Sequence, residues 1–123
     1  MSSPTARTGA TCESQAQAYL EQQGLTPLAR NYRCKIGEID LIMRDGETTV
    51  FVEVRHRRSR HYGGARASIT HAKMRRVART AQVFMKHQKM PFETPIRFDV
   101  VTIDGALNQQ PTTSWLKAAF EFE

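Results

Sequence analysis

The chain has 123 residues, which is enough for one domain with its own hydrophobic core. Hydrophobic residues make up 40% and charged residues 24%, a composition typical of a soluble globular protein. No apolar run approaches the roughly 18–20 residues that a membrane-spanning helix needs, and the first ten residues lack the apolar stretch of a signal peptide. We therefore expect no membrane partner and a cytoplasmic location, where Cys12 and Cys34 would be free thiols.

The net charge is +6, but the basic residues are concentrated in one part of the chain. Residues 55–89 contain 11 of the 18 Lys and Arg residues, all four His and none of the 12 acids. Such a segment indicates one positive surface, for which DNA or RNA is the natural partner. A solvated helix face that happens to be basic is the simpler alternative. The length of the acid-free segment favours a nucleic-acid partner over that alternative.

In chain order, residues 1–9 are polar and are predicted to be disordered. The first helix is predicted over residues 10–23 and ends before Gly24, a residue type common at helix C-termini. Glu13 lies seven residues before Leu20, so it shares the apolar face of this helix. A carboxylate on such a face needs a partner or a function.

Three strands are predicted next. Residues 25–33 form a short edge strand, because Pro27 cannot donate a hydrogen bond to a neighbouring strand. Residues 37–44 and 49–57 form two further strands, joined by a hairpin turn at Asp45-Gly46. The two faces of the first hairpin strand carry Glu38, Asp40 and Ile42, and Ile39, Leu41 and Met43. Those of the second carry Phe51, Glu53, Arg55 and Arg57, and Val50, Val52, Val54 and His56.

The second half of the chain is predicted to contain a long helix and a buried strand. Residues 58–68 form a loop, and a helix follows over residues 70–87 with Thr70 as its N-cap. Its buried stripe is predicted to consist of Met74, Val77, Ala78, Ala81, Phe84 and Met85. Residues 97–104 form a strand buried on both faces, and residues 113–120 a short helix or strand. This order predicts one α/β domain over residues 1–123, with a mixed central sheet flanked by helices.

The hairpin places two carboxylates side by side. Its turn centres near residue 46, so facing positions have numbers that sum to about 93, which pairs Asp40 with Glu53. Neighbouring carboxylates repel each other unless a cation such as Mg²⁺ lies between them. Arg55 lies on the same side of the sheet as Glu53 and could bind a phosphate, and Glu13 could supply a third carboxylate. A polar hairpin face with cross-strand ion pairs is the alternative, which the apolar neighbours of these acids disfavour.

The segments GEIDLI and FVEVR, about a dozen residues apart, resemble the metal-binding motif of restriction-endonuclease-like nucleases. Residues 9–103 as a whole resemble the UPF0102 (YraN-like) family of small bacterial proteins. The matching segments are AYLEQQG, ARNYRCKIGEIDLI, VFVEVRHR, HAKMRRVARTA and RFDVV. The resemblance implies a three-layer α/β/α restriction-endonuclease-like fold and phosphodiester hydrolysis that depends on Mg²⁺ or Mn²⁺. Many proteins of this fold are dimers, so a homodimer would be compatible with it.

The resemblance also assigns roles to individual residues. Asp40 and Glu53 correspond to the metal-binding acids, and the backbone carbonyl of Val54 to a further metal ligand. Glu13 matches a first-helix glutamate of archaeal Holliday-junction-resolvase relatives, although Cys12 replaces the glycine that usually precedes it. Arg55 stands where the nucleases of this fold usually carry lysine. Arginine stays protonated in proteins and cannot act as a base, but it can hold phosphate or orient water.

Three functions follow as hypotheses. The first is a metal-dependent endonuclease that cleaves DNA, with branched or structured DNA as a candidate substrate. The second is a non-catalytic nucleic-acid-binding protein that keeps the nuclease-like fold. The third is an interaction protein whose basic helix meets an acidic partner. For the first two, the predicted nucleic-acid contacts are Arg57, Arg58, Lys73, Arg75, Arg76 and Arg79.

Overall fold

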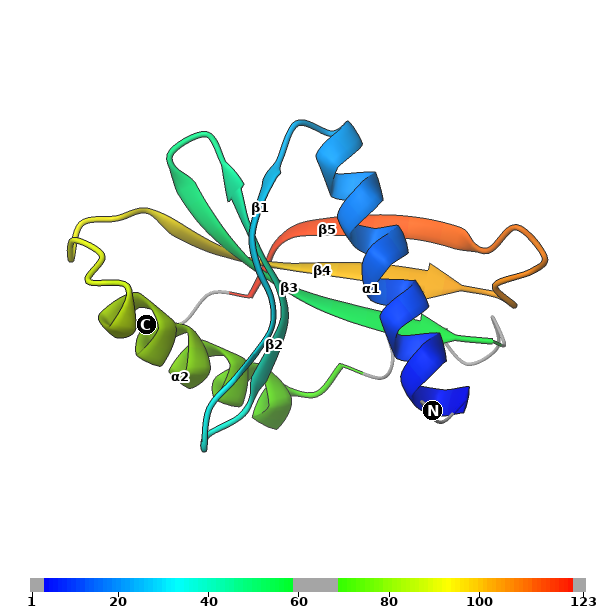
Figure 1. The fold of residues 1–123 in the computed structure, drawn as a ribbon, viewed down its shortest axis with the longest axis horizontal. Helices are drawn as coiled ribbons and strands as arrows, with labels where there is room; N and C mark the ends of the chain where they lie inside the picture. The colour runs from blue at the N-terminus through cyan, green and yellow to red at the C-terminus, as the bar shows by residue number, and fades with distance from the viewer. Residues whose placement is uncertain (1–3, 59–68, 121–123) are drawn as a thin grey trace.

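The computed structural model describes residues 4–58 and 69–120 and contains two helices and five strands (Figure 1). In chain order these are α1 (Pro4–Gln22), β1 (Thr26–Arg33), β2 (Glu38–Asp45), β3 (Thr48–Arg57), α2 (His71–His87), β4 (Ile96–Asp104) and β5 (Thr112–Phe120). The strands form one sheet in the order β1-β2-β3-β4-β5. Neighbouring strands are antiparallel except for β3 and β4, which are parallel and joined through α2. This confirms the predicted α/β class with a mixed sheet.

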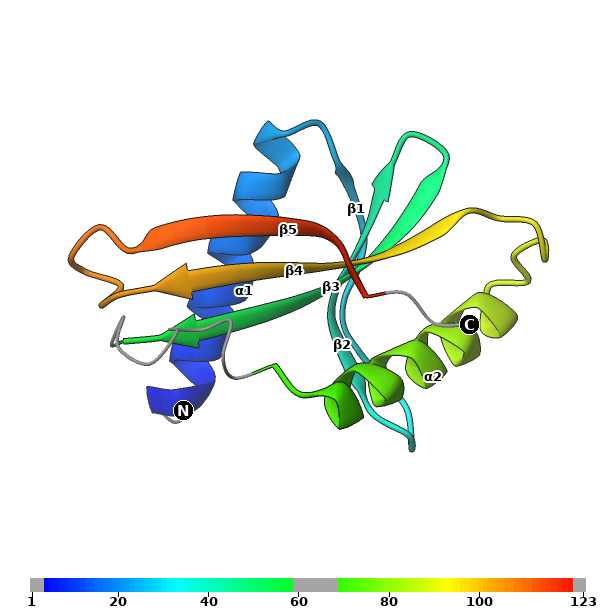
Figure 2. The same cartoon turned by 180° about the vertical axis from the view of Figure 1, so that it is seen from behind.

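The helices cover opposite faces of the sheet, which gives three layers (Figures 1 and 2). Ala16 and Leu20 of α1 pack on a core formed by Leu25, Leu41, Met43, Val50, Val52 and Val101. The apolar stripe of α2 packs on the other face, against Ile39, Ile42, Phe51 and Phe98. The side chains of β3 and β4 alternate between these two cores, so the central strands are buried on both faces.

The ends of the helices follow local sequence signals. The side chain of Thr70 accepts a hydrogen bond from the backbone N–H of Lys73 at 3.2 Å, which confirms it as the N-cap of α2. Gly24 adopts a positive φ of 98° directly after α1, and the N–H of Leu25 donates to the carbonyl of Leu20. At its other end, α1 begins at Pro4 rather than at residue 10. Proline suits the first position of a helix because the N–H it lacks would have no partner there.

Three further predictions concern residues 113–120, the buried stripe of α2 and the loop over residues 58–68. Residues 113–120, predicted as a helix or a strand, belong to strand β5, which pairs with β4 at the sheet edge. The buried stripe of α2 includes Thr80, which was not predicted because its hydroxyl is polar. That hydroxyl donates to the carbonyl of Arg76 at 2.8 Å, so it is satisfied inside the core. The predicted loop over residues 58–68 lies outside the described residues except for Arg58.

Two expectations from composition can also be compared with the described chain. Cys12 and Cys34 are free thiols, as predicted. Neither of the described helices has the length and apolar character needed to cross a bilayer.

Candidate metal and nucleic-acid site

The candidate site lies where β2 and β3 separate. Their antiparallel ladder runs from Asp45 opposite Thr48 to Leu41 opposite Val52, in the register predicted from the turn. Asp40 and Glu53 would form the next pair. Instead, the Asp40 carboxylate accepts a hydrogen bond from the backbone N–H of Val54 at 2.8 Å. The Asp40 side chain thus binds a backbone N–H of β3. The backbone pairing of β2 with β3 ends at Leu41 and Val52, next to the two predicted acids.

A twist in β2 also sets the direction of Asp40. Strict alternation was predicted to put Ile39 and Ile42 on opposite faces, but both pack in the core beneath α2, so that prediction was wrong. A matching irregularity occurs in the neighbouring strand. Asn31 of β1 has a positive φ of 54° and falls between the residues of β1 that pair with Leu41 and Ile39. Asparagine tolerates this left-handed conformation better than most residues. In both paired strands, the alternation of side chains between the two sheet faces is therefore interrupted beside Asp40.

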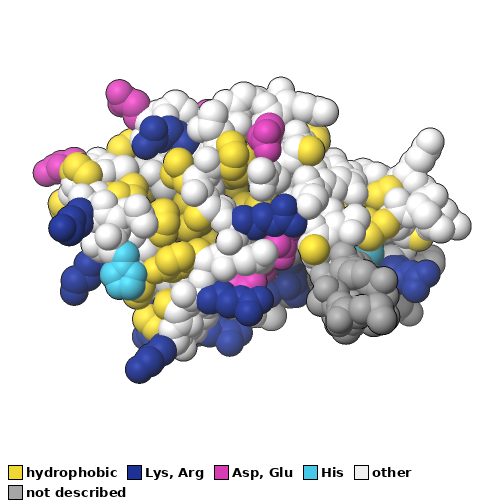
Figure 3. All heavy atoms as spheres, in the orientation of Figure 1, with side chains coloured by type: hydrophobic (Ala, Val, Ile, Leu, Met, Phe, Trp, Pro, Cys, Tyr) yellow, Lys and Arg dark blue, Asp and Glu magenta, His cyan; other side chains and the backbone are white. Residues whose placement is uncertain are grey.

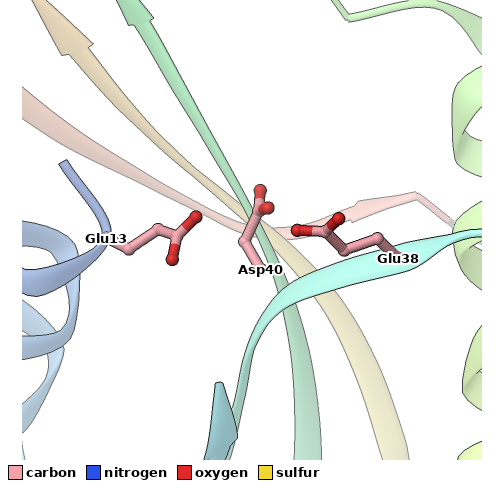
Figure 4. Close-up of side chains that lie close together, drawn as sticks. All are labelled: Glu13, Glu38 and Asp40. Carbon is pink, nitrogen blue, oxygen red and sulfur yellow. The ribbon is translucent and has the colours of Figure 1, made fainter. Parts of the chain in front are cut away.

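Three carboxylates converge at this point. Oxygens of Glu13, Glu38 and Asp40 lie within 4.8 Å of one another. Figure 4 shows Glu13 reaching from α1 and Glu38 from β2, so that they approach Asp40 from opposite sides. The Glu13 side chain is only 14% exposed and pairs with Arg30 at 3.4 Å. Glu13 thus meets Asp40 as predicted, while Glu38 is an additional member. Its place on the same strand face as Asp40 was the sequence signal for it.

Glu53 adjoins this cluster and is held by two cations. Its side chain is only 4% exposed, and its carboxylate lies 2.8 Å from the ammonium nitrogen of Lys73 and 3.5 Å from the Arg55 guanidinium. Arg55 therefore lies beside Glu53, as predicted. Lys73 was predicted to contact nucleic acid, not to be part of the acidic site. Helical spacing carries a signal for this position, because Lys73 lies four and seven residues before the buried Val77 and Thr80.

One cavity connects these groups. It has a volume of about 290 Å³ and is lined by Gly37, Glu38, Asp40, Glu53, Lys73, Arg76 and Val77. Gly37 lets β2 approach α2 closely, since a Cβ atom at this position would lie 3.1 Å from the hydroxyl of Thr80. The cavity wall thus combines acids from the sheet with cations from the first half of α2. Figure 3 shows acidic side chains between Lys and Arg side chains near the centre of this face.

The environment of Asp40 changes its protonation. Burial, followed by repulsion from Glu53 and Glu13, raises its pKa from 3.8 to about 8, although the hydrogen bond from Val54 acts in the opposite direction. At neutral pH and without a metal, the Asp40 carboxyl therefore holds a proton. Glu13, Glu38 and Glu53 each pair with a cation, so the raised pKa of Asp40 reflects mainly its burial, with repulsion from Glu53 and Glu13 adding to it.

The donor atoms of the cluster fit a hard divalent cation. Each of Glu13, Glu38 and Asp40 offers one carboxylate oxygen, and these oxygens lie within 4.8 Å of one another, so the three side chains could hold one ion between them. All three donors are carboxylates, which suits Mg²⁺ or Mn²⁺ better than metals that prefer sulfur or imidazole. The carbonyl of Val54, expected from the resemblance to bind the metal, stays a prediction.

The other five predicted phosphate contacts are all exposed. Arg57 and Arg58 are exposed at the end of β3, and Arg75, Arg76 and Arg79 are exposed along α2. Of these, Arg76 also lines the cavity that contains Asp40 and Glu53. Of the predicted phosphate contacts, Lys73 and Arg76 thus line the cavity beside the acidic cluster.

Comparison with known proteins identifies the family. The sequence profile of the uncharacterised protein family UPF0102 matches residues 12–103. A UPF0102 protein of Nitrosomonas europaea is 50% identical over 113 residues, which are 92% of each chain. One from Alkalilimnicola ehrlichii is 50% identical over 117 residues, 95% of this chain and 89% of its own. One from Pseudomonas fluorescens is 46% identical over 113 residues, 92% of each chain. The chain therefore belongs to the uncharacterised protein family UPF0102.

Proposed function

We propose that this protein is a metal-dependent endonuclease that hydrolyses phosphodiester bonds in DNA, in the cytoplasm. The observation that carries the proposal is the convergence of Glu13, Glu38 and Asp40 next to Glu53. Glu38, Asp40 and Glu53 line a cavity that Lys73 and Arg76 also line. A purely structural cluster would pair each acid with a cation. In the described part of the chain Glu13, Glu38 and Glu53 each pair with a cation, whereas Asp40 accepts the N–H of Val54 and its pKa is raised, which supports Asp40 as the acid that a metal ion would compensate.

In this proposal each group in the cavity has a chemical role. Glu13, Glu38 and Asp40 would hold Mg²⁺ or Mn²⁺, with Glu53 close enough to take part. When bound, such an ion polarises the phosphate and lowers the pKa of a coordinated water. Val54 fixes the direction of the Asp40 carboxylate through its N–H. Arg55 neutralises charge beside Glu53 and can hold a phosphate oxygen, although it cannot accept a proton. Together with the fold, these roles correspond to a restriction-endonuclease-like nuclease.

The basic surface supports a nucleic acid as the substrate. Arg75, Arg76 and Arg79 are exposed on α2, and Arg57 and Arg58 extend the positive charge beyond β3. Arginine and lysine side chains at such positions bind backbone phosphates regardless of sequence. Recognition through the backbone suits a substrate defined by its shape, and so we favour branched or structured DNA.

Cleavage assays test the proposal directly. The purified protein would be incubated with Mg²⁺ or Mn²⁺ and with linear, flapped and four-way DNA of one sequence, and with the corresponding RNA. We expect cleavage of at least one DNA, lost on addition of EDTA and reduced by about 100-fold or more in Asp40→Asn. Glu47→Gln removes an acid from the exposed hairpin turn and serves as the control with unchanged activity. Equal activity of wild type and Asp40→Asn, or no metal-dependent cleavage of any substrate, would contradict the proposal.

Arg55 supports a second candidate function, binding of nucleic acid without cleavage. An arginine beside Glu53 preserves the positive charge of the motif's usual lysine but not its ability to lose a proton. This alternative predicts DNA binding that weakens steeply with salt and is as tight in Asp40→Asn as in wild type. It also predicts that replacing Arg75, Arg76 and Arg79 by glutamine weakens binding.

A further inference from the structure

We propose that Lys73 takes the place of a divalent ion at Glu53 in the metal-free protein and moves to the substrate phosphate when the metal binds. The inference deepens the proposed function and rests on its metal site. The exchange breaks the ion pair between Lys73 and Glu53 and makes one between Lys73 and phosphate. The negative charge of Glu53 is then compensated by the metal. No covalent bond changes.

The first support is the contact itself. The ammonium nitrogen of Lys73 lies 2.8 Å from a Glu53 oxygen, closer than the 3.5 Å contact made by Arg55. Glu53 is almost fully buried, so its charge needs a close counter-ion whenever no metal is present. Lys73 is therefore the nearer of the two cations that compensate Glu53 in this structure.

The second support is that Lys73 can move while its backbone stays fixed. Its N–H donates to the Thr70 side chain, and the nearby α2 residues Met74 and Val77 are buried in the core. The side chain itself is 32% exposed and ends in the cavity. Lysine combines a compact charge with a flexible four-carbon chain, which lets the ammonium change partners without movement of the helix.

The third support is electrostatic. A divalent ion bound by Asp40 would place two positive charges in the cavity that the Lys73 ammonium also enters. Like charges at such short range repel strongly inside a protein, so the ammonium would leave Glu53 for the nearest anion. Arg76 lines the same cavity one helical turn further on. Lys73 and Arg76 can therefore contact neighbouring oxygens of one phosphate, since side chains three residues apart lie next to each other on a helix.

The test compares Lys73→Gln with Lys86→Gln, which removes the same charge from the last turn of α2, away from the cavity. Mn²⁺ affinity is measured without nucleic acid, and four-way DNA affinity is measured in EDTA and in Ca²⁺. Loss of Lys73 should tighten Mn²⁺ binding about fivefold or more, because the metal no longer competes with the ammonium. It should also abolish most of the gain in DNA affinity that Ca²⁺ gives to wild type. Lys86→Gln should match wild type in the Mn²⁺ affinity and in the Ca²⁺-dependent gain.

Lys73→Arg keeps the positive charge and controls for effects on folding. It should have a Mn²⁺ affinity within about twofold of wild type and should retain part of the Ca²⁺-dependent gain in DNA binding. Weaker or unchanged Mn²⁺ binding in Lys73→Gln would overturn the inference, as would a Ca²⁺-dependent gain equal to that of wild type. Neither outcome depends on cleavage, so the endonuclease proposal could fail while this inference holds. A wild-type protein that binds neither Mn²⁺ nor Ca²⁺ would overturn both.

Discussion

The protonation of Asp40 makes a prediction about stability that needs no substrate and no metal. Replacing Asp40 with asparagine keeps the size of the side chain and an oxygen that can accept the N–H of Val54. It removes the cost of placing an acid next to Glu53 and Glu13. We therefore expect the Asp40→Asn protein to be more stable than wild type in EDTA at pH 8.

The direction and size of the effect follow from the pKa. Folding raises the pKa of Asp40 from 3.8 to about 8, so between these values the folded protein binds more protons than the unfolded chain. Its stability must therefore be fully present below pH 4 and fall as the pH rises to 8, by at most about 1.4 kcal/mol per pH unit. The full difference between the two pKa values would correspond to about 6 kcal/mol. Because Asp40 is partly exposed and coupled to Glu53, we expect about 2 kcal/mol.

Urea unfolding between pH 4.5 and 8.5 measures this difference. The gain in Asp40→Asn should be about 2 kcal/mol at pH 8 and should shrink towards zero near pH 4.5. Glu47→Gln, at the exposed hairpin turn, should follow wild type at every pH. A difference that does not change with pH, or an Asp40→Asn protein less stable than wild type at pH 8, would refute the account of the buried cluster.

Three other predictions test different parts of the structure. Gly37→Ala should lower the free energy of unfolding in urea by about 1 kcal/mol and slow any cleavage. The reason is that its Cβ would lie 3.1 Å from the Thr80 hydroxyl. An equal loss of stability when Gly37→Ala is made in the Thr80→Ala protein would contradict this explanation. Asp99→Asn should cost about 3 kcal/mol, since this residue is 1% exposed, pairs with Arg97 of the same strand and accepts hydrogen bonds from Trp115 and Ala118 of β5. An unchanged melting temperature would count against it. Replacing Arg75 and Arg79 with glutamine should reduce by about two the number of ions released on DNA binding, which is measured as the slope of log affinity against log salt concentration. The Mn²⁺ affinity should not change. An unaltered slope would exclude both residues as phosphate contacts.

The sequence predicted the parts of the site that depend on local order. The short turn at Asp45-Gly46 fixes the hairpin register, and alternation along β3 puts Glu53 and Arg55 on one face. Helical spacing in α1 directs Glu13 toward the sheet, where it meets Asp40. These rules work because each relates residues that are close in the chain.

The features that the sequence did not predict depend on distant neighbours. The change of face in β2 occurs beside Asn31, a residue with a positive φ in a different strand, and it places Ile39 on the side of α2. The ion pair of Lys73 with Glu53 requires α2 to be placed against the sheet, which no local pattern determines. Likewise, residues 113–120 form β5 because β4 offers them an edge. Local propensity alone leaves such a segment open between helix and strand.

The central claim is that Glu13, Glu38 and Asp40 form a site for a divalent cation. Crystals grown with Mn²⁺ and measured at the manganese absorption edge would test it most directly, since anomalous scattering locates the ion without reference to activity. The account predicts an anomalous peak about 2.2 Å from an Asp40 carboxylate oxygen, with oxygen ligands only. A map without a peak at this cluster in crystals soaked at saturating Mn²⁺, or with peaks only at histidines elsewhere, would contradict it.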